Sequence, residues 1–170
     1  GAQSLTNPNS TVVLTNAAQV RQLSSAAAAE GLLVRVRGVV TYFDPENELA
    51  FVQDPTAGTY VDPAWRVIES PAYSGPIMAG LMVELTGHSR PGRFAPFVSH
   101  NPAVKVLRLM DSLPEPMRPL RGLLLDPTFH SQWIELEVFV RNARIDNGRL
   151  RMGLTYGPRH FEAFVTGDWQ

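Results

Sequence analysis

The sequence predicts an all-β fold with short helices, arranged as two tandem OB-like small β-barrels, the second incomplete. Two observations lead to this prediction. From residue 33 onward, short stretches carry apolar side chains at every second position and are separated by turn residues, as half-buried strands require. The pattern then restarts, because residues 134–140 repeat residues 34–40. The 170 residues therefore divide into a lead-in with short helices (1–30), a first OB-like barrel (31–110), a Pro-rich linker (111–119) and a truncated second OB-like module (120–170).

The lead-in is expected to begin as an extended segment rich in Asn, Ser and Thr, and then to form two short helices. Thr15 is a suitable N-cap for a helix over residues 16–23, because its hydroxyl can accept a hydrogen bond from a free backbone N–H of the first turn. Ser25 can cap a second short turn over residues 26–30 in the same way. A glycine follows and ends the helical pattern.

The first barrel is expected to contain five strands. In the first strand, Val34, Val36 and Val40 alternate with polar residues, and Gly38 marks a bend. Turn residues rich in Pro, Asp, Asn and Gly separate the strands that follow. Five short strands in about 80 residues fit a small closed barrel better than a sandwich. The four later strands are expected at residues 49–54, 59–62, 81–87 and 103–109.

The second module is expected to repeat the first three strands. Three prolines make residues 113–119 a stiff, extended linker, after which residues 134–140 form the first repeat strand. An Asp-Asn-Gly turn at residues 146–148 then leads to a second strand, and residues 161–165 form a third. Val138 replaces the glycine of the first copy, so the second copy lacks the residue that marks the bend. Without two further strands, a sheet edge stays open, and we expect homo-oligomers through this edge.

Composition excludes several classes of function. The net charge is -1, and residues 31–110 carry seven acidic and seven basic side chains, so we expect no binding of nucleic acid. The absence of cysteine excludes disulfides, thiolate metal sites and cysteine nucleophiles, and leaves both the cytosol and the periplasm open. No stretch approaches the roughly 20 apolar residues that span a bilayer, so we do not expect the chain to insert into a membrane. Because it begins at Gly1, we interpret the chain as part of a longer protein.

No catalytic motif is present. The four histidines, His88, His100, His130 and His160, lack the close spacing of metal ligands, although His88 and His100 flank one loop and could meet. Serine nucleophile elbows, phosphate-binding glycine loops and paired catalytic carboxylates are also missing. We therefore predict that the protein is not an enzyme and uses no cofactor or metal.

A candidate binding site lies in the connection between the fourth and fifth strands, residues 88–102. In OB barrels this loop and the loop after the first strand flank the usual binding face. A second interpretation is that the phenylalanines of this connection fill one end of the barrel, while its arginines face the solvent there. Trp65 and Trp133 are interpreted as packing residues. The candidate ligand-binding residues are Phe43, Arg90, Arg93, Phe94 and Phe97.

A resemblance to a known family is carried by residues 31–45, 49–54, 58–61, 83–87 and 130–137. With these segments the chain resembles the tandem OB-like region found outside the membrane in certain bacterial two-component sensor histidine kinases. The resemblance covers about residues 13–165 and implies a non-catalytic module for ligand sensing or interaction, within a larger signal-transduction protein of the bacterial periplasm. The implied ligand is an unknown small molecule, glycan or protein.

Two other functions stay open. Fold analogy allows a module that binds single-stranded nucleic acid, although one fold serves many functions. A carbohydrate-binding or peptide-binding module is a further alternative, in which a peptide could add a strand to an open sheet edge.

Overall fold

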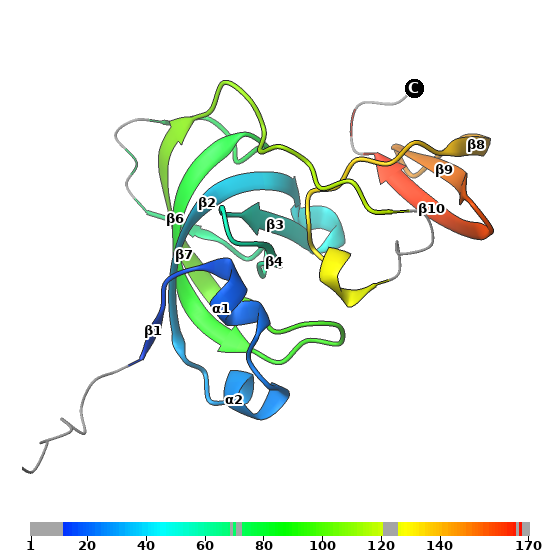
Figure 1. Cartoon of the computed structure of the whole chain (residues 1–170). Helices are drawn as coiled ribbons and strands as arrows, with labels where there is room; N and C mark the ends of the chain where they lie inside the picture. Colours follow the sequence, from blue (N-terminus) through cyan, green and yellow to red (C-terminus); the bar gives the residue numbers. More distant parts are fainter. Residues whose placement is uncertain (1–11, 69, 71–72, 121–125, 166, 168–170) are drawn as a thin grey trace, which may run out of the picture. The chain divides into compact units, whose positions relative to one another are not determined.

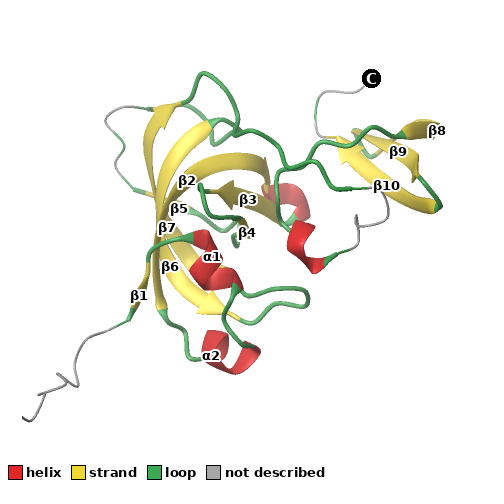
Figure 2. Cartoon of the chain, viewed as in Figure 1, coloured by secondary structure: helices red, strands yellow, loops and turns green. Residues whose placement is uncertain are grey.

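The computed structural model describes residues 12–68, 70, 73–120, 126–165 and 167, without the side chain of His100. The first eleven residues of the expected lead-in lie outside this part. The described chain consists mainly of strands with a few short helices, which confirms the all-β prediction (Figure 2). It forms two compact units, Gly1–Leu113 and Pro114–Gln170.

The first unit is a sheet that curls around one core, with β2, β6 and β7 as its long curved strands (Figure 1). Its strands are hydrogen-bonded in the order β4-β3-β2-β6-β7-β5, and β1 pairs with β2. Strands β2, β3, β4, β6 and β7 thus follow each other as in an OB barrel. The elements are β1 (Val13–Leu14), α1 (Ala17–Arg21), α2 (Ser25–Ala29), β2 (Leu33–Asp44), the 3-10 helix η1 (Pro45–Asn47), β3 (Leu49–Gln53), β4 (Gly58–Tyr60), β5 (Arg66–Val67), β6 (Leu81–Arg90) and β7 (Phe97–Leu109).

Strand β2 serves both halves of the sheet. Its first part pairs with β6 and its second part pairs with β3, and Val39 takes part in both ladders. Gly38 directly precedes this switch and is buried. A Cβ at Gly38 would lie 2.7 Å from the backbone oxygen of Gln53, so a side chain would push β3 away. The bend therefore requires glycine for close approach of two strands.

The sheet is not closed by a ladder, and its end at β4 is joined to β7 through one bridge. Val61, directly after β4, forms an isolated parallel bridge with Val98 of β7. The backbone N–H of Asp62 donates to the carbonyl of Val98 at 2.8 Å. Away from this bridge, the described parts of β4 and β7 form no ladder with each other.

The core fills the inside of the curled sheet with the alternating residues that the sequence predicts. Trp65 and Phe43 pack against it from the side, so the interpretation of Trp65 as a packing residue is confirmed. The buried apolar cluster consists of Leu14, Val20, Val34, Val36, Val40, Val52, Val61, Leu81, Val83, Leu85, Val98, Val104 and Val106.

The N-cap of each helix lies one residue away from the expected N-cap. Asn16, and not Thr15, caps α1, because its side chain accepts from the backbone N–H of Gln19 while the Gln19 side chain accepts from the Asn16 backbone. Ser24, and not Ser25, caps α2 and accepts from the backbone N–H of Ala27. Asparagine and serine are both strong N-caps. Where two suitable residues are neighbours, tertiary contacts decide which of them caps the helix.

Strands β6 and β7 are longer than the sequence predicted, so the expected connection over residues 88–102 is wrong. The ladder continues to the pair Arg90 and Phe97, and the loop is confined to residues 91–96. A register shift between Thr86 and His88, opposite Asn101 with its φ of 45°, allows this continuation. A bulge of this kind allows a strand to contain a residue that does not fit a regular ladder. Here that residue is the proline at position 102.

The second unit is a three-stranded antiparallel sheet with the order β10-β9-β8. Asn147 and Gly148, with φ values of 50° and 73°, form the two-residue turn between β8 and β9, as the sequence predicted. The expected strand over residues 134–140 is wrong for most of its length: β8 begins only at Phe139, and Ile134 forms an isolated bridge with Met117. The elements are the 3-10 helix η2 (Pro127–Phe129), β8 (Phe139–Asp146), β9 (Arg149–Tyr156) and β10 (Arg159–Val165).

The end of the proline-rich segment is bonded to the second unit. The Met117 backbone N–H donates to the carbonyl of Trp133, and the Tyr156 hydroxyl donates to the carbonyl of Pro119 at 2.9 Å. Residues 117–119 therefore form part of the second unit.

Candidate functional site

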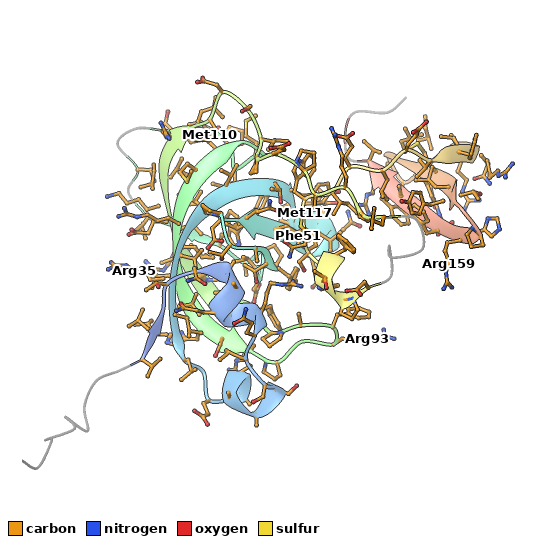
Figure 3. The ribbon with its side chains drawn as sticks, in the orientation of Figure 1. Arg35, Phe51, Arg93, Met110, Met117 and Arg159 are labelled. Atoms are coloured by element: carbon orange, nitrogen blue, oxygen red, sulfur yellow. The ribbon has the colours of Figure 1, made fainter. Side chains whose placement is uncertain are left out.

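Four aromatic side chains form a row across the outside of the first barrel. They come from four strands: Tyr42 from β2, Phe51 from β3, Tyr60 from β4 and Phe97 from β7. Neighbouring ring centroids lie 6.5 Å, 5.8 Å and 5.3 Å apart along the row. All four side chains are half-buried, so one face of the row is accessible to a ligand. Figure 3 labels Phe51 within this row.

The register of the strands builds this row. Tyr42 pairs with Phe51, and Phe51 pairs with Tyr60, in the antiparallel ladders of β2, β3 and β4. The bridge between Val61 and Val98 turns both valines into the core. Because successive side chains of a strand point to opposite faces, the residues before and after each valine point outward together.

A pocket of about 400 Å³ lies at the Tyr60 and Phe97 end of the row. Its volume falls within the range of small-molecule sites. One wall comes from the turn after β2, one from β4 and the residues that follow it, and one from the start of β7. In OB barrels, ligands bind over the second and third strands, between the loop after strand one and the loop before strand five. The pocket is lined by the loop after strand one and by Tyr60 of β4, the third barrel strand, so it borders this face. Its lining residues are Pro45, Glu48, Tyr60, Asp62, Pro63, Ala64, Phe97 and Ser99.

Glu48 holds the turn that forms one wall. It ends η1 in the left-handed conformation, with φ of 56°, which favours glycine and costs other residues about 1–2 kcal/mol. Its backbone carbonyl accepts a hydrogen bond from the Tyr60 hydroxyl at 2.9 Å. The turn after β2 is thereby tied to β4, and the carboxylate of Glu48 is placed at the pocket.

Asp62 is fixed on the opposite wall. One carboxylate oxygen accepts from the Ser99 hydroxyl at 3.1 Å, and the other accepts from the backbone N–H of Ala64 at 3.0 Å. Burial, and then the negative charges of Asp62 and Glu48, raise the pKa of Tyr60. The phenol therefore stays neutral and keeps its proton for the bond to Glu48.

The candidate residues from the sequence separate into four environments. Phe97 lines the pocket, whereas Phe43 packs on Trp65 with ring centroids 4.8 Å apart. Phe94 lies in the β6–β7 loop, is 67% exposed, and has the Arg93 guanidinium 5.3 Å from its ring centroid. Arg90 ends β6 opposite Phe97. The structure thus places Phe97 alone of these five in the wall of the pocket that it describes.

Sequence reasoning missed Tyr60, Asp62 and Glu48. The alternation did contain a signal, because Phe51 and Tyr60 occupy the outward positions beside inward Val52 and Val61. Two outward aromatic residues on adjacent strands form an apolar pair at the surface. Apolar groups that gather at the surface indicate a binding site. The left-handed Glu48 left no comparable signal, because glutamate is not a residue that marks such a turn.

A second, smaller hollow of about 290 Å³ lies on the sheet of the second unit. Beside it, the Thr155 hydroxyl accepts from Arg141 Nε at 3.1 Å and contacts His160 Nδ1 at 3.2 Å. Within the described residues, no group of three or more His, Cys, Asp or Glu side chains is placed to hold a metal ion. No described helix has the length and apolar character needed to cross a membrane.

Comparison with known proteins identifies no family. No family model and no curated protein matches the chain. Among solved structures, the hypothetical protein ygiW from E. coli is similar to this chain with a TM-score of 0.39 and 15% identity, over 56% of this chain and 90% of that one.

Proposed function

We propose that the chain is a non-catalytic binding region and that its first unit binds a ligand in the pocket beside Tyr60 and Phe97. One observation carries this proposal: the row of aromatic side chains ends in a pocket that borders the face over which OB barrels bind their ligands. Half-buried aromatic rings offer a large contact area at a low cost in side-chain entropy. The resemblance to bacterial sensor histidine kinases supports a role in extracytoplasmic ligand sensing, within a larger periplasmic signal-transduction protein.

The electrostatics of the pocket disfavour single-stranded nucleic acid as the ligand. OB modules that bind nucleic acid combine aromatic rings with a positively charged groove. The pocket has aromatic rings, but the charged residues in its wall are Glu48 and Asp62. Phosphate groups would be repelled there.

The proposal is tested by NMR of the 15N-labelled chain with a mixture of small fragments of different charge. We expect the perturbed amide signals to cluster at Glu48, Tyr60, Asp62 and Ser99. Phe97→Leu, which removes a ring of the pocket, should weaken binding of the fragments that perturb these signals. Phe94→Leu is the matched control, since Phe94 lies outside the pocket.

Two results would count against the proposal. Fragments that bind only the second unit, or only the β6–β7 loop, would place the site elsewhere. Tight, salt-sensitive binding of a fluorescein-labelled oligothymidylate would favour the nucleic-acid alternative.

A further inference from the structure

We propose that the pocket beside Tyr60 and Phe97 takes an organic cation, either a free small molecule such as a quaternary ammonium compound or the cationic side chain of a peptide. This inference rests on the proposed function, because it assigns a ligand class to the same pocket. It is carried by the charge of the pocket, the bonding of its carboxylates and the arrangement of its rings.

The pocket is negatively charged without local compensation. Glu48 and Asp62 line it, and no lysine, arginine or histidine does. In the part of the chain that the structure describes, neither carboxylate forms an ion pair with a basic side chain. The first unit as a whole carries eight basic and nine acidic side chains, so its net charge is small and the negative potential is a local feature of the pocket.

The bonding of Asp62 favours a cationic partner. Both carboxylate oxygens already accept a hydrogen bond, from Ser99 and from the Ala64 backbone, and the residue is half-buried. A carboxylate has room for about four hydrogen bonds, and a partly buried anion gains most from a positive charge. The two bonds hold the carboxylate in place before any ligand arrives. Binding therefore costs this side chain little conformational entropy.

The rings of Tyr60 and Phe97 supply the complementary surface. Their centroids are 5.3 Å apart and their planes make an angle of 56°, so that they form an open corner. The faces of aromatic rings attract cations, and corners of this kind recognise quaternary ammonium groups. The raised pKa of Tyr60, which burial and then the charges of Asp62 and Glu48 produce, agrees with a negative potential at this ring.

Other ligand classes use fewer of these features. An anion would be repelled by both carboxylates. A neutral sugar could stack on the rings and bond to a carboxylate, but the charge of the pocket would contribute little to its affinity. The cation is therefore the class that the pocket fits best.

Isothermal titration calorimetry with matched pairs of probes tests this inference on the full chain. Choline is compared with 3,3-dimethyl-1-butanol, its neutral isostere, to represent a free small-molecule cation. Nα-acetyl-arginine amide is compared with Nα-acetyl-citrulline amide to represent a peptide side chain. We expect at least one cation to bind with a millimolar Kd, as suits a small ligand, and its neutral isostere to bind at least about tenfold more weakly.

Two charge-removing variants connect the selectivity to the pocket. Asp62→Asn and Glu48→Gln keep size and shape and remove the charge. In Asp62→Asn one acceptor oxygen becomes an NH2 donor, from which the Ser99 hydroxyl can accept in place of donating. Each variant should weaken cation binding about five- to tenfold, since a partly exposed charge in contact with the ligand contributes near the aqueous limit. Glu46→Gln is the matched control, because Glu46 lies in the same turn but not in the pocket wall. Thermal melting of each variant verifies that it is folded.

The outcomes separate this inference from the proposed function. Cation-selective binding that Asp62→Asn weakens and Glu46→Gln leaves unchanged supports the inference, and the pair of probes that shows it identifies the source of the cation. Binding of neutral sugars or of the isosteres at the pocket, without preference for the cation, overturns the inference and leaves the proposed function standing. No binding by any cation, or equal weakening by all three variants, also overturns it. The fragment experiment, which includes ligands of every charge, then decides on the pocket itself.

Discussion

Val61 and Val98 form the parallel bridge that joins the end of β4 to β7 in the first unit, and the same bridge positions the candidate site. Because both valines point into the core, Tyr60 lies beside Phe97, and Asp62 beside Ser99, on the outer face. One contact between two distant strands thus serves both stability and binding.

The first prediction concerns the bend of β2. Gly38→Val should destabilise the first unit by about 1–3 kcal/mol, because the new side chain would meet the backbone of Gln53 and the side chain of Val52, which cannot both move without opening the ladder. Urea denaturation followed by circular dichroism measures the effect. In the matched control, Gly153→Val, the new Cβ meets the amide group of Asn142, which can rotate away, so the cost should be smaller. Equal stability of Gly38→Val and the parent would show that the close approach is not required.

A second prediction concerns the buried Ser89. Its hydroxyl accepts from the backbone N–H of Leu32 at 2.9 Å and donates to the carbonyl of Ala28 at 3.1 Å, so it connects the end of α2 to β6. Ser89→Ala should lower the free energy of unfolding by about 1–3 kcal/mol, since both backbone groups lose this partner. Hydrogen exchange should also quicken at the Leu32 amide. An unchanged exchange rate at this amide would argue against the connection.

The third prediction concerns the pH dependence of stability. The hydrogen bond from Arg37 Nε to Glu84, at 2.7 Å, lowers the pKa of Glu84 below its ordinary value of 4.5. A depressed pKa stabilises the fold at pH values above the unfolded pKa, and this contribution is lost as the pH falls through the folded pKa. Arg37→Gln should therefore raise the pKa of Glu84 and cost about 0.2–1 kcal/mol at pH 7, the range for surface pairs.

NMR titration of the Glu84 side chain and urea denaturation at several pH values measure these two effects. Parent and Arg37→Gln should approach equal stability at the lowest pH, where Glu84 is protonated in both. A constant difference at every pH would show that Arg37 stabilises the fold by packing and not by charge.

The fourth prediction concerns association through the second unit. In the described part of the chain, β8 pairs only with β9, and its Phe139 and Val140 are 73% and 57% exposed. An apolar edge with unpaired backbone groups favours strand pairing with another chain, so we expect a concentration-dependent dimer or higher oligomer. Val140→Lys should shift the protein toward monomer in light scattering coupled to size exclusion. Val12→Lys is the control, because Val12 is 60% exposed but lies outside the sheets. A parent that is monomeric at all concentrations would contradict the prediction.

The sequence predicted the local features of the fold well. Alternation identified the buried Val34 and Val36, and the hairpin at Asn147 and Gly148 followed from turn chemistry. Both depend on neighbours in the chain. The alternating residues 134–138 show the limit of this reasoning, because alternation makes a strand only where another strand pairs with it, and there only Ile134 forms a bridge.

The candidate site could not be predicted to the same degree. Of its residues, Phe97 was expected from the position of its loop, whereas Tyr60 and Asp62 join it only through the bridge between Val61 and Val98. Such a contact joins residues far apart in the chain and leaves no periodic signal. Because β6 and β7 are longer than the sequence predicted, Arg93 and Phe94 lie at the tip of a short hairpin. They are therefore not part of a long binding loop.

Isotope-filtered NOE spectroscopy of the labelled chain with choline tests the central claim most directly. If the pocket binds the cation between its two rings, the choline methyl protons should show NOEs to the ring protons of both Tyr60 and Phe97, and these should disappear on addition of excess Nα-acetyl-arginine amide if both cations share the site. NOEs to Phe94 or to the second unit, without any to Tyr60 and Phe97, would contradict the account.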